Sequence, residues 1–263
     1  MSPAVLYRQL PGEGLDAFIT QFRKAATRDP FGTVFIVPTA RLAREIIRRL
    51  GEEGVPVVAD TVTTLSGFAR KVFFDYATSE TLISGAESRL IIERLLASGR
   101  YPLLSRTGAA DELATLFEVI LKRKVDYPAA LGDRVTARSV EIARLLDAYR
   151  LFLDEHDLVD EAMLFARVAR MLSDTGLFRT VYIYGIFEPM PRAGGSHYVR
   201  PPRTVFVYGL FEPMPLERDL LFALRDSADD FHYSIPYTRN PAIFADNGEW
   251  LYPDAVISGD APG

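Results

Sequence analysis

Apolar residues in the first third of the chain alternate between strand-like runs and helix-like spacing. The fully apolar, β-branched run at 33–37 is typical of a central parallel strand covered on both faces. Short apolar runs at 4–7 and 55–58 predict two further strands. Apolar residues at helical spacing predict three helices, over 16–26, 41–50 and 65–76. This alternation predicts an α/β fold with a parallel sheet flanked by helices.

The pattern changes between residues 78 and 177, where helical spacing recurs without an evident strand. Four helices are predicted there, over 87–97, 111–122, 140–156 and 160–172. We therefore expect 78–177 to be an all-helical insertion subdomain. It would separate the first part of the sheet domain, residues 1–77, from its return in residues 178–263.

The strand pattern returns at Thr180 in a segment that occurs twice. Residues 180–191 and 204–215 are identical at nine of twelve positions. Two copies are too few for a repeat solenoid, so we interpret the pair as a local duplication with one copy in the sheet. The second copy runs into a predicted helix over 216–224 and a strand over 231–235, and the tail beyond shows no clear element.

Composition and charge narrow the possible functions. The chain has no cysteine, which excludes disulfides and Cys-ligated metal sites and fits a reducing compartment. It shows no secretory signal and no apolar run long enough to span a membrane, so we expect a cytoplasmic protein. The net charge of −5 does not predict a general attraction to nucleic acid. Residues 41–49 nevertheless carry four arginines against one glutamate, which either form a local basic face or a solvated helix surface.

The turn after the first predicted strand is placed where a phosphate-binding loop would lie. It contains Gly12 and Gly14, but Leu15 and Asp16 follow where such loops carry Lys and Ser/Thr. A leucine cannot neutralise phosphate, and a carboxylate facing a triphosphate repels it. We therefore expect no bound nucleotide and no other cofactor.

Three segments, in order, resemble a known family. Residues 33–46 resemble the strand and helix after the phosphate loop of UvrD-type helicases, and are still more similar to the N-terminal region of AddB-type helicase–nuclease subunits. Residues 62–72 resemble the family's next segment, and 208–217 resemble its Gly-Phe-x-x-Phe-x-Pro-Leu-Gln segment. The resemblance implies a RecA-like, P-loop NTPase-like sheet with a helical insertion, ending before the PD-(D/E)XK nuclease domain of that family.

In active members of the family, the last of these segments begins with Asp-Glu, which holds Mg²⁺ and activates water. Tyr208 and Gly209 stand there in this chain, and Tyr184 and Gly185 in the other copy. The resemblance thus implies a degenerate Walker B motif in addition to the degenerate phosphate loop. It implies a non-catalytic, DNA-binding scaffold in double-strand-break repair or recombination. The alternatives are an active, nucleotide-dependent helicase or nuclease component and a protein-interaction module without a nucleic-acid role.

If the fold is helicase-like, the loops after the second and third strands are where DNA would run. Polar side chains on these loops and the helices behind them would contact phosphates: Thr39, Arg41, Thr64, Ser66 and Arg70. The alternative is that the threonines only cap helices. The partners implied are single-stranded or end-containing DNA and a UvrD/AddA-type helicase subunit, with no membrane.

Other side chains give weaker signals. Alternating aromatics at 182, 184, 206 and 208 would either stack on bases or fill the core, and core packing explains them better. Acidic residues between 154 and 161 fit helix caps and solvated turns better than a cation site. The three histidines lack the spacing of a metal site, so no metal is expected.

Overall fold

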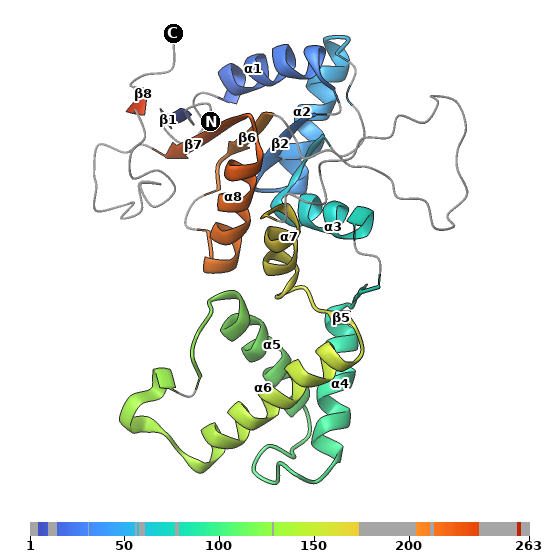
Figure 1. The fold of residues 1–263 in the computed structure, drawn as a ribbon, viewed down its shortest axis with the longest axis vertical. Coiled ribbons are helices and arrows are strands. Elements are labelled where there is room, and N and C mark those ends of the chain that lie inside the picture. Colours follow the sequence, from blue (N-terminus) through green and yellow to red (C-terminus); the bar gives the residue numbers. More distant parts are fainter. Residues whose placement is uncertain are drawn as a thin grey trace, which may run out of the picture. The chain divides into compact units, whose positions relative to one another are not determined.

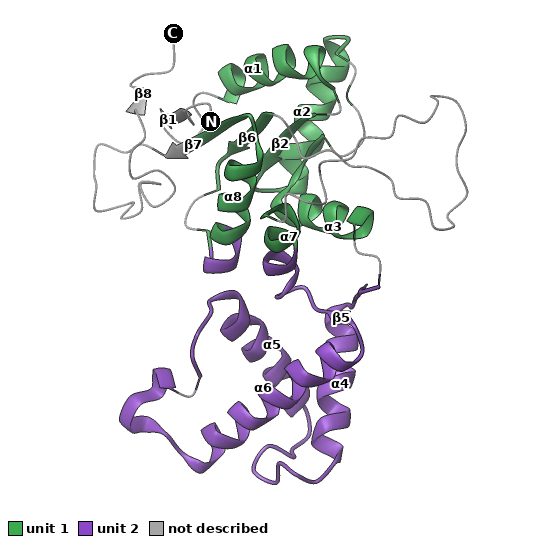
Figure 2. Cartoon of the chain, viewed as in Figure 1, with its two compact units in different colours: residues 1–76, 168–213, 218–263 green, residues 77–167, 214–217 purple. Residues whose placement is uncertain are grey.

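The computed structural model describes residues 5–9, 15–30, 32–55, 57, 61–76, 79–127, 129–173, 204–210, 213–236 and 257–258. The protein is an α/β protein with a parallel sheet flanked by helices (Figure 1). It divides into unit 1, formed by residues 1–76, 168–213 and 218–263, and unit 2, formed by residues 77–167 and 214–217 (Figure 2). None of the helices among the described residues is long and apolar enough to cross a membrane.

Unit 1 is built on a sheet of six parallel strands, in the order β3-β2-β6-β7-β1-β8. Its strands are β1 (Val5–Gln9), β2 (Thr33–Val37), β3 (Val62–Thr64), β6 (Thr204–Tyr208), β7 (Asp230–Pro236) and β8 (Ile257–Ser258). Val37 pairs with Thr64, and Phe35 pairs with Phe206. Because the strands are parallel, their carboxyl ends meet at one edge of the sheet.

Helices cover both faces of this sheet (Figure 1). On one face, α1 (Leu15–Arg28) and α2 (Ala40–Glu52) share a core with β2 and β6. On the other face lie α3 (Leu65–Tyr76) and α8 (Pro215–Ser227). All five residues of β2 are buried, as an apolar run in a doubly covered sheet should be.

The core between the sheet and its first two helices is aromatic. Phe206 lies with its ring centroid 6.0 Å from that of Phe18 and 5.9 Å from that of Phe22. On its other side it stacks on His232 of β7, at 4.6 Å and an interplanar angle of 9°. Phe206 is 2% exposed, so its ring belongs to the core and is closed to a stacking base.

Unit 2 is mainly helical. It contains α4 (Gly85–Ala97), α5 (Ala109–Lys122), the 3-10 helix η1 (Ala129–Arg134), α6 (Ala137–Glu155) and most of the first turn of α7 (Leu164–Ser173). Its core includes Ile92, Phe117 and Tyr149. It also contains a parallel pair of strands, β4 (Thr81–Leu82) and β5 (Leu158–Val159). The expectation of an all-helical segment is wrong in this respect, because a two-residue strand leaves no alternating pattern in the sequence.

Two further expectations about strands are wrong. The third strand of the sheet is Val62–Thr64, whereas Val55 and Val57 lie outside any strand and pack, half-buried, against the core of unit 1. The apolar residues 55 and 57 are thus partly buried without forming a strand, and the more polar segment Val62–Thr64 pairs with β2 instead. The tail also contributes β8, which pairs with β1 although its sequence shows no strand signal. The first copy of the duplicated segment, 180–191, lies outside the described residues.

Candidate functional site

The start of α1 lies beside the carboxyl end of β6. Leu15 is half-buried against the core of unit 1, and Asp16 extends outward with its side chain 81% exposed. The ring centroids of Phe18 and Tyr208 are 5.9 Å apart. Burial raises the pKa of the Tyr208 phenol, and the negative charge of Asp16 raises it further. The structure therefore brings together Leu15, Asp16 and Tyr208, while Gly12 and Gly14 lie outside the described residues.

These side chains cannot perform the chemistry of a nucleotide site. A triphosphate with Mg²⁺ needs a lysine against its phosphates and a carboxylate that holds the metal. Leu15 supplies no charge, and Tyr208 is a neutral phenol at neutral pH, as an ordinary tyrosine is, with its pKa raised further by burial. The Asp16 carboxylate is directed to Arg49, whose Nη2 lies 2.7 Å from its Oδ1. An arginine engaged in this pair is poorly placed to supply the positive charge that a triphosphate needs.

The turn after β6 depends on a glycine at position 209. Gly209 has a φ of +71°, and a Cβ added there would lie 3.4 Å from Cγ of Pro38, in the loop after β2. Residues other than glycine, asparagine and aspartate are disfavoured in this left-handed conformation by about 1–2 kcal/mol. Tyr233 of β7 fixes the same turn, because its hydroxyl donates a 2.6 Å hydrogen bond to the carbonyl of Leu210. A glutamate at 209 would therefore be strained as well as lacking its aspartate neighbour.

The two threonines at the neighbouring strand ends cap helices. Thr39 Oγ1 accepts a hydrogen bond from the backbone N–H of Leu42 at 3.2 Å, which begins α2. Thr64 Oγ1 accepts one from the N–H of Gly67 at 3.0 Å, which begins α3. The capping interpretation is confirmed for both hydroxyls. Each hydroxyl hydrogen remains available for donation, so capping does not exclude a contact with phosphate.

The polar residues expected to contact DNA lie along this same edge. Thr39 and Thr64 follow adjacent strands, since Val37 at the end of β2 pairs with Thr64 in register. Arg41 and Ser66 are exposed in the first turns of α2 and α3. Arg70 is also exposed, four residues after Ser66 and hence on the same face of α3.

The starts of α2 and α3, like those of α6 and α7, carry no acidic side chain. By contrast, α1, α4 and α5 have Asp16, Glu87 and Asp111 in their first turns. The partial positive charge at a helix start attracts anions, and an acidic side chain nearby satisfies it. At α2 and α3 that attraction is left for an external anion.

Three features of the structure have no signal in the sequence pattern. Gly67 is needed because an added Cβ would lie 2.4 Å from Oγ1 of Thr63. Tyr233 anchors the turn after β6 from a neighbouring strand. In unit 2, Asp160 is buried and accepts a 2.9 Å hydrogen bond from Tyr149, although its acidic neighbours Asp154 and Asp157 are exposed, as caps and turns would be.

Metal binding finds no support among the residues that the structure describes, where no three His, Asp or Glu side chains gather as ligands. His156 stacks on Phe152 and His232 on Phe206, while His197 lies outside the described residues. No protein-family model matches the sequence, and no curated protein matches it either.

Proposed function

We propose that unit 1 is a RecA-like, helicase-type domain that does not hydrolyse ATP and that holds single-stranded or end-containing DNA at the carboxyl edge of its sheet. The strand order supports this fold. Strands β6 and β7 lie between β1 and β2, so the first two strands of the sheet are not neighbours. In the doubly wound dinucleotide-binding and flavodoxin-like sheets, by contrast, the first two strands are neighbours.

The observation that carries the proposal is the proximity of Asp16 and Tyr208, which are far apart in sequence. They stand at the positions where the resemblance to UvrD-type helicases expects the phosphate loop and the Walker B motif. Asp16 influences the pKa of Tyr208, so the two altered motifs belong to one place. When two altered motifs lie at one place, the loss of a single activity explains both of them. Two unrelated substitutions would have no reason to be neighbours in the fold.

The edge beside this place offers the chemistry of backbone recognition in nucleic acids. Hydroxyl groups, arginines and helix starts are the groups that contact phosphate oxygens without reading the base sequence. Thr39, Arg41 and Ser66 are exposed there, and the starts of α2 and α3 carry no acidic side chain. The resemblance to AddB-type subunits further suggests that the domain acts beside a UvrD/AddA-type helicase in double-strand-break processing.

Binding to a labelled 20-nucleotide oligothymidine, followed by fluorescence anisotropy at several salt concentrations, tests the proposal. Arg41→Ala and Arg70→Ala should each weaken binding about three- to tenfold and lower the slope of log Kd against log salt by about 0.7 for each phosphate that is no longer neutralised. Arg144→Ala, which removes an exposed arginine of α6 in unit 2, is the matched control and should change nothing.

The alternative of an interaction module without a nucleic-acid role makes the opposite prediction. It expects no salt-dependent binding, or a decrease in Arg144→Ala as large as that in Arg41→Ala. Circular dichroism of each variant should match the parent, because the three arginines lie on helix surfaces.

A further inference from the structure

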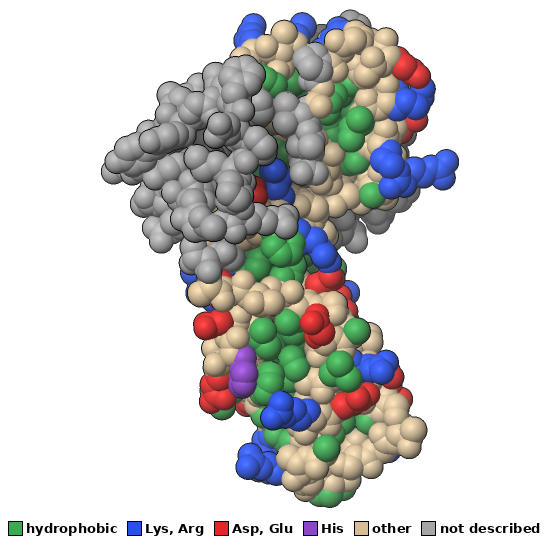
Figure 3. Space-filling model, turned by 90° about the vertical axis from the view of Figure 1, so that its right-hand side faces the viewer, with side chains coloured by type: hydrophobic (Ala, Val, Ile, Leu, Met, Phe, Trp, Pro, Cys, Tyr) green, Lys and Arg blue, Asp and Glu red, His purple; other side chains and the backbone are tan. Residues whose placement is uncertain are grey.

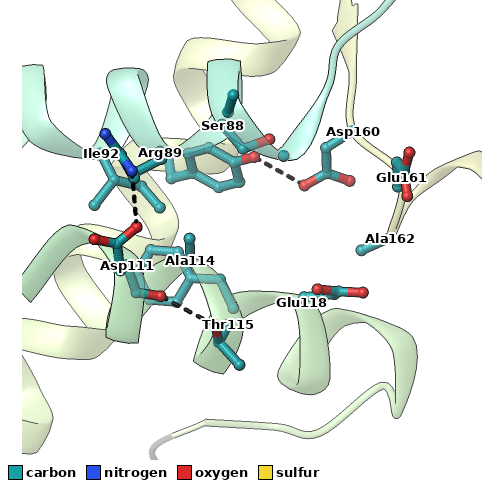
Figure 4. A pocket seen from close by; sticks show the side chains of 14 residues that line it. Ser88, Arg89, Ile92, Asp111, Ala114, Thr115, Glu118, Asp160, Glu161 and Ala162 are labelled. Carbon is teal, nitrogen blue, oxygen red and sulfur yellow. Dashed lines mark hydrogen bonds and ion pairs between the residues drawn. The ribbon is translucent and has the colours of Figure 1, made fainter.

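Unit 2 contains a cavity of about 350 Å³ between α4, α5, α6 and the turn that follows β5 (Figure 4). Apolar side chains form part of its wall, among them Ile92, Phe117 and Ala162. Four carboxylates also line it, from Asp111, Glu118, Asp160 and Glu161. Its size lies at the lower end of the range for small-molecule sites.

Asp160 is the buried carboxylate of this cavity, with 6% of its surface exposed. Its Oδ2 accepts a hydrogen bond from the Tyr149 hydroxyl at 2.9 Å, and its Oδ1 accepts one from the Met163 N–H at 2.8 Å. These bonds hold the group in place. Two carboxylate oxygens have about four acceptor sites, so the group retains capacity for a further donor.

The charge of Asp160 lacks a cationic counterpart among the described groups that act on it most strongly. These groups are Tyr149, Ala162, Met163 and Glu118, and Glu118 is itself an acid that repels it. Burial is the main cause that raises the pKa of Asp160. A buried carboxylate without a counter-ion is costly, and a cation in the cavity would relieve that cost.

The arginine that lines the cavity is engaged elsewhere. Arg89 Nη1 lies 3.1 Å from Asp111 Oδ1, and its Nε lies 3.3 Å from Glu93. Figure 4 shows Arg89 beside Asp111 at one end, whereas Asp160, Glu161 and Glu118 lie at the other. At the second end Glu118 pairs with Lys122, whereas Asp160 takes part in no ion pair among the described residues, so Asp160 is the carboxylate that would attract a further positive charge.

The shape of the site selects an organic cation over a metal ion. Among the described residues, no three carboxylate or imidazole side chains converge closely enough to hold a metal. An ammonium group has three N–H donors, which can bridge more widely spaced carboxylates. Its alkyl stem would lie against the accessible apolar lining at Ala86 and Ala114, as long basic side chains lie against apolar surface elsewhere.

We propose that this cavity binds a primary alkylammonium group, with the ammonium between Asp160 and Glu118 and the stem against Ala86 and Ala114. The group belongs either to a small free amine or to a lysine side chain of another protein. The inference rests on unit 2 alone and does not depend on the function proposed for unit 1.

The probes are n-butylammonium and a terminally blocked pentapeptide with one lysine among glycines. Their neutral counterparts are 1-butanol and the same peptide with norleucine. Binding to the full chain is followed by NMR through the amide shifts of Ala162 and Met163. We expect an ammonium probe to bind about tenfold or more tightly than its neutral counterpart. Binding of the amine alone assigns a free amine, and binding of the peptide assigns a lysine of a partner.

Asp160→Asn should weaken binding about tenfold or more, Glu118→Gln about two- to threefold, and Asp133→Asn, exposed on η1, not at all. Affinity should rise with pH as Asp160 ionises. If Asp160→Asn does not fold, Glu118→Gln and the pH dependence of the affinity test the proposal instead, because Glu118 is exposed and pairs with Lys122. The proposal is overturned if neither ammonium probe binds at about 10 mM, if the neutral probes bind equally well, or if folded Asp160→Asn binds unchanged.

Discussion

The carboxyl edge of unit 1 and the cavity of unit 2 use charge in opposite ways. At the edge, hydroxyls and arginines lie at helix starts that carry no acidic side chain. In the cavity, four carboxylates line the wall together with one arginine, which already pairs with Asp111. Figure 3 shows acidic and basic side chains on the described surface of both units, and on unit 2 they lie around hydrophobic ones. A single net charge of −5 hides this contrast, and each site has to be judged from its own surroundings.

The two units also differ in how their cores are built. In unit 1, aromatic rings from α1 and two strands cluster around Phe206 among aliphatic side chains. Unit 2 is filled mainly by aliphatic side chains between helices, with Phe117 and Tyr149 as its paired rings. The two cores share no residue, so changes in one can be compared with changes in the other.

The largest expected effect comes from Phe206→Ala, which leaves a cavity among three phenylalanines and His232. Such truncations cost about 3–5 kcal/mol of unfolding free energy. Hydrogen exchange should show the loss in β2 and β6, while α5 and α6 stay protected. Phe117→Ala is the matched change in unit 2 and should give the reverse pattern. Equal loss of protection in both units from either change would contradict separate cores.

A smaller effect is expected from Tyr149→Phe, which removes a hydrogen-bond donor to buried Asp160. The loss should be about 1–3 kcal/mol and should be felt most when Asp160 is ionised. The folded-state pKa of Asp160 is raised above its ordinary 3.8, so the folded chain holds this proton more tightly than the unfolded chain does. This group's contribution to stability is therefore fully present below 3.8 and is lost as pH rises through the folded-state pKa.

The Tyr149 hydrogen bond lowers the pKa of Asp160, so Tyr149→Phe should raise that pKa further. The pH range over which stability is lost should then extend to higher pH. Urea unfolding at pH 4, 6 and 8 measures the change. The variant should lose more stability at pH 8 than at pH 4. A loss that is independent of pH would show that the tyrosine hydroxyl supports packing and not the buried charge.

The smallest effect tests the edge of unit 1. Gly67→Ala should cost about 1–2 kcal/mol, because the new Cβ would meet Oγ1 of Thr63 at 2.4 Å. Gly51→Ala in α2 meets nothing within 4 Å and should stabilise by about 0.5–1 kcal/mol. Thermal unfolding compares the two. Thr63→Ala in the Gly67→Ala background should restore most of the stability, and a lack of rescue would contradict the proposed clash.

The sequence predicts the elements of this fold better than their arrangement. The helix at 65–76 is found with its expected limits, because its apolar spacing is regular and Thr64 caps it. β3 escapes prediction because a three-residue strand at the edge of the sheet leaves little pattern. The order of the strands is not encoded locally, since β1 pairs with β7 more than 200 residues later.

The two candidate sites also differ in how far the sequence predicts them. Leu15, Asp16 and Tyr208 can be singled out because a motif states which residue each position should carry, and the structure then brings them together. The cavity of unit 2 cannot, because its lining comes from three helices and a turn between residues 85 and 162. Asp160 looks in sequence like its exposed acidic neighbours, and only tertiary packing distinguishes it.

We propose that unit 1 retains the arrangement of a nucleotide-dependent motor without its chemistry. Isothermal titration of the chain with ATP, in the presence and absence of Mg²⁺, tests it most directly. We predict no saturable binding up to about 1 mM, the upper end of ordinary substrate affinities. Mg²⁺-dependent binding of ATP in the micromolar range would contradict the account, because Leu15 and Tyr208 provide neither a charge for the phosphates nor a ligand for the metal.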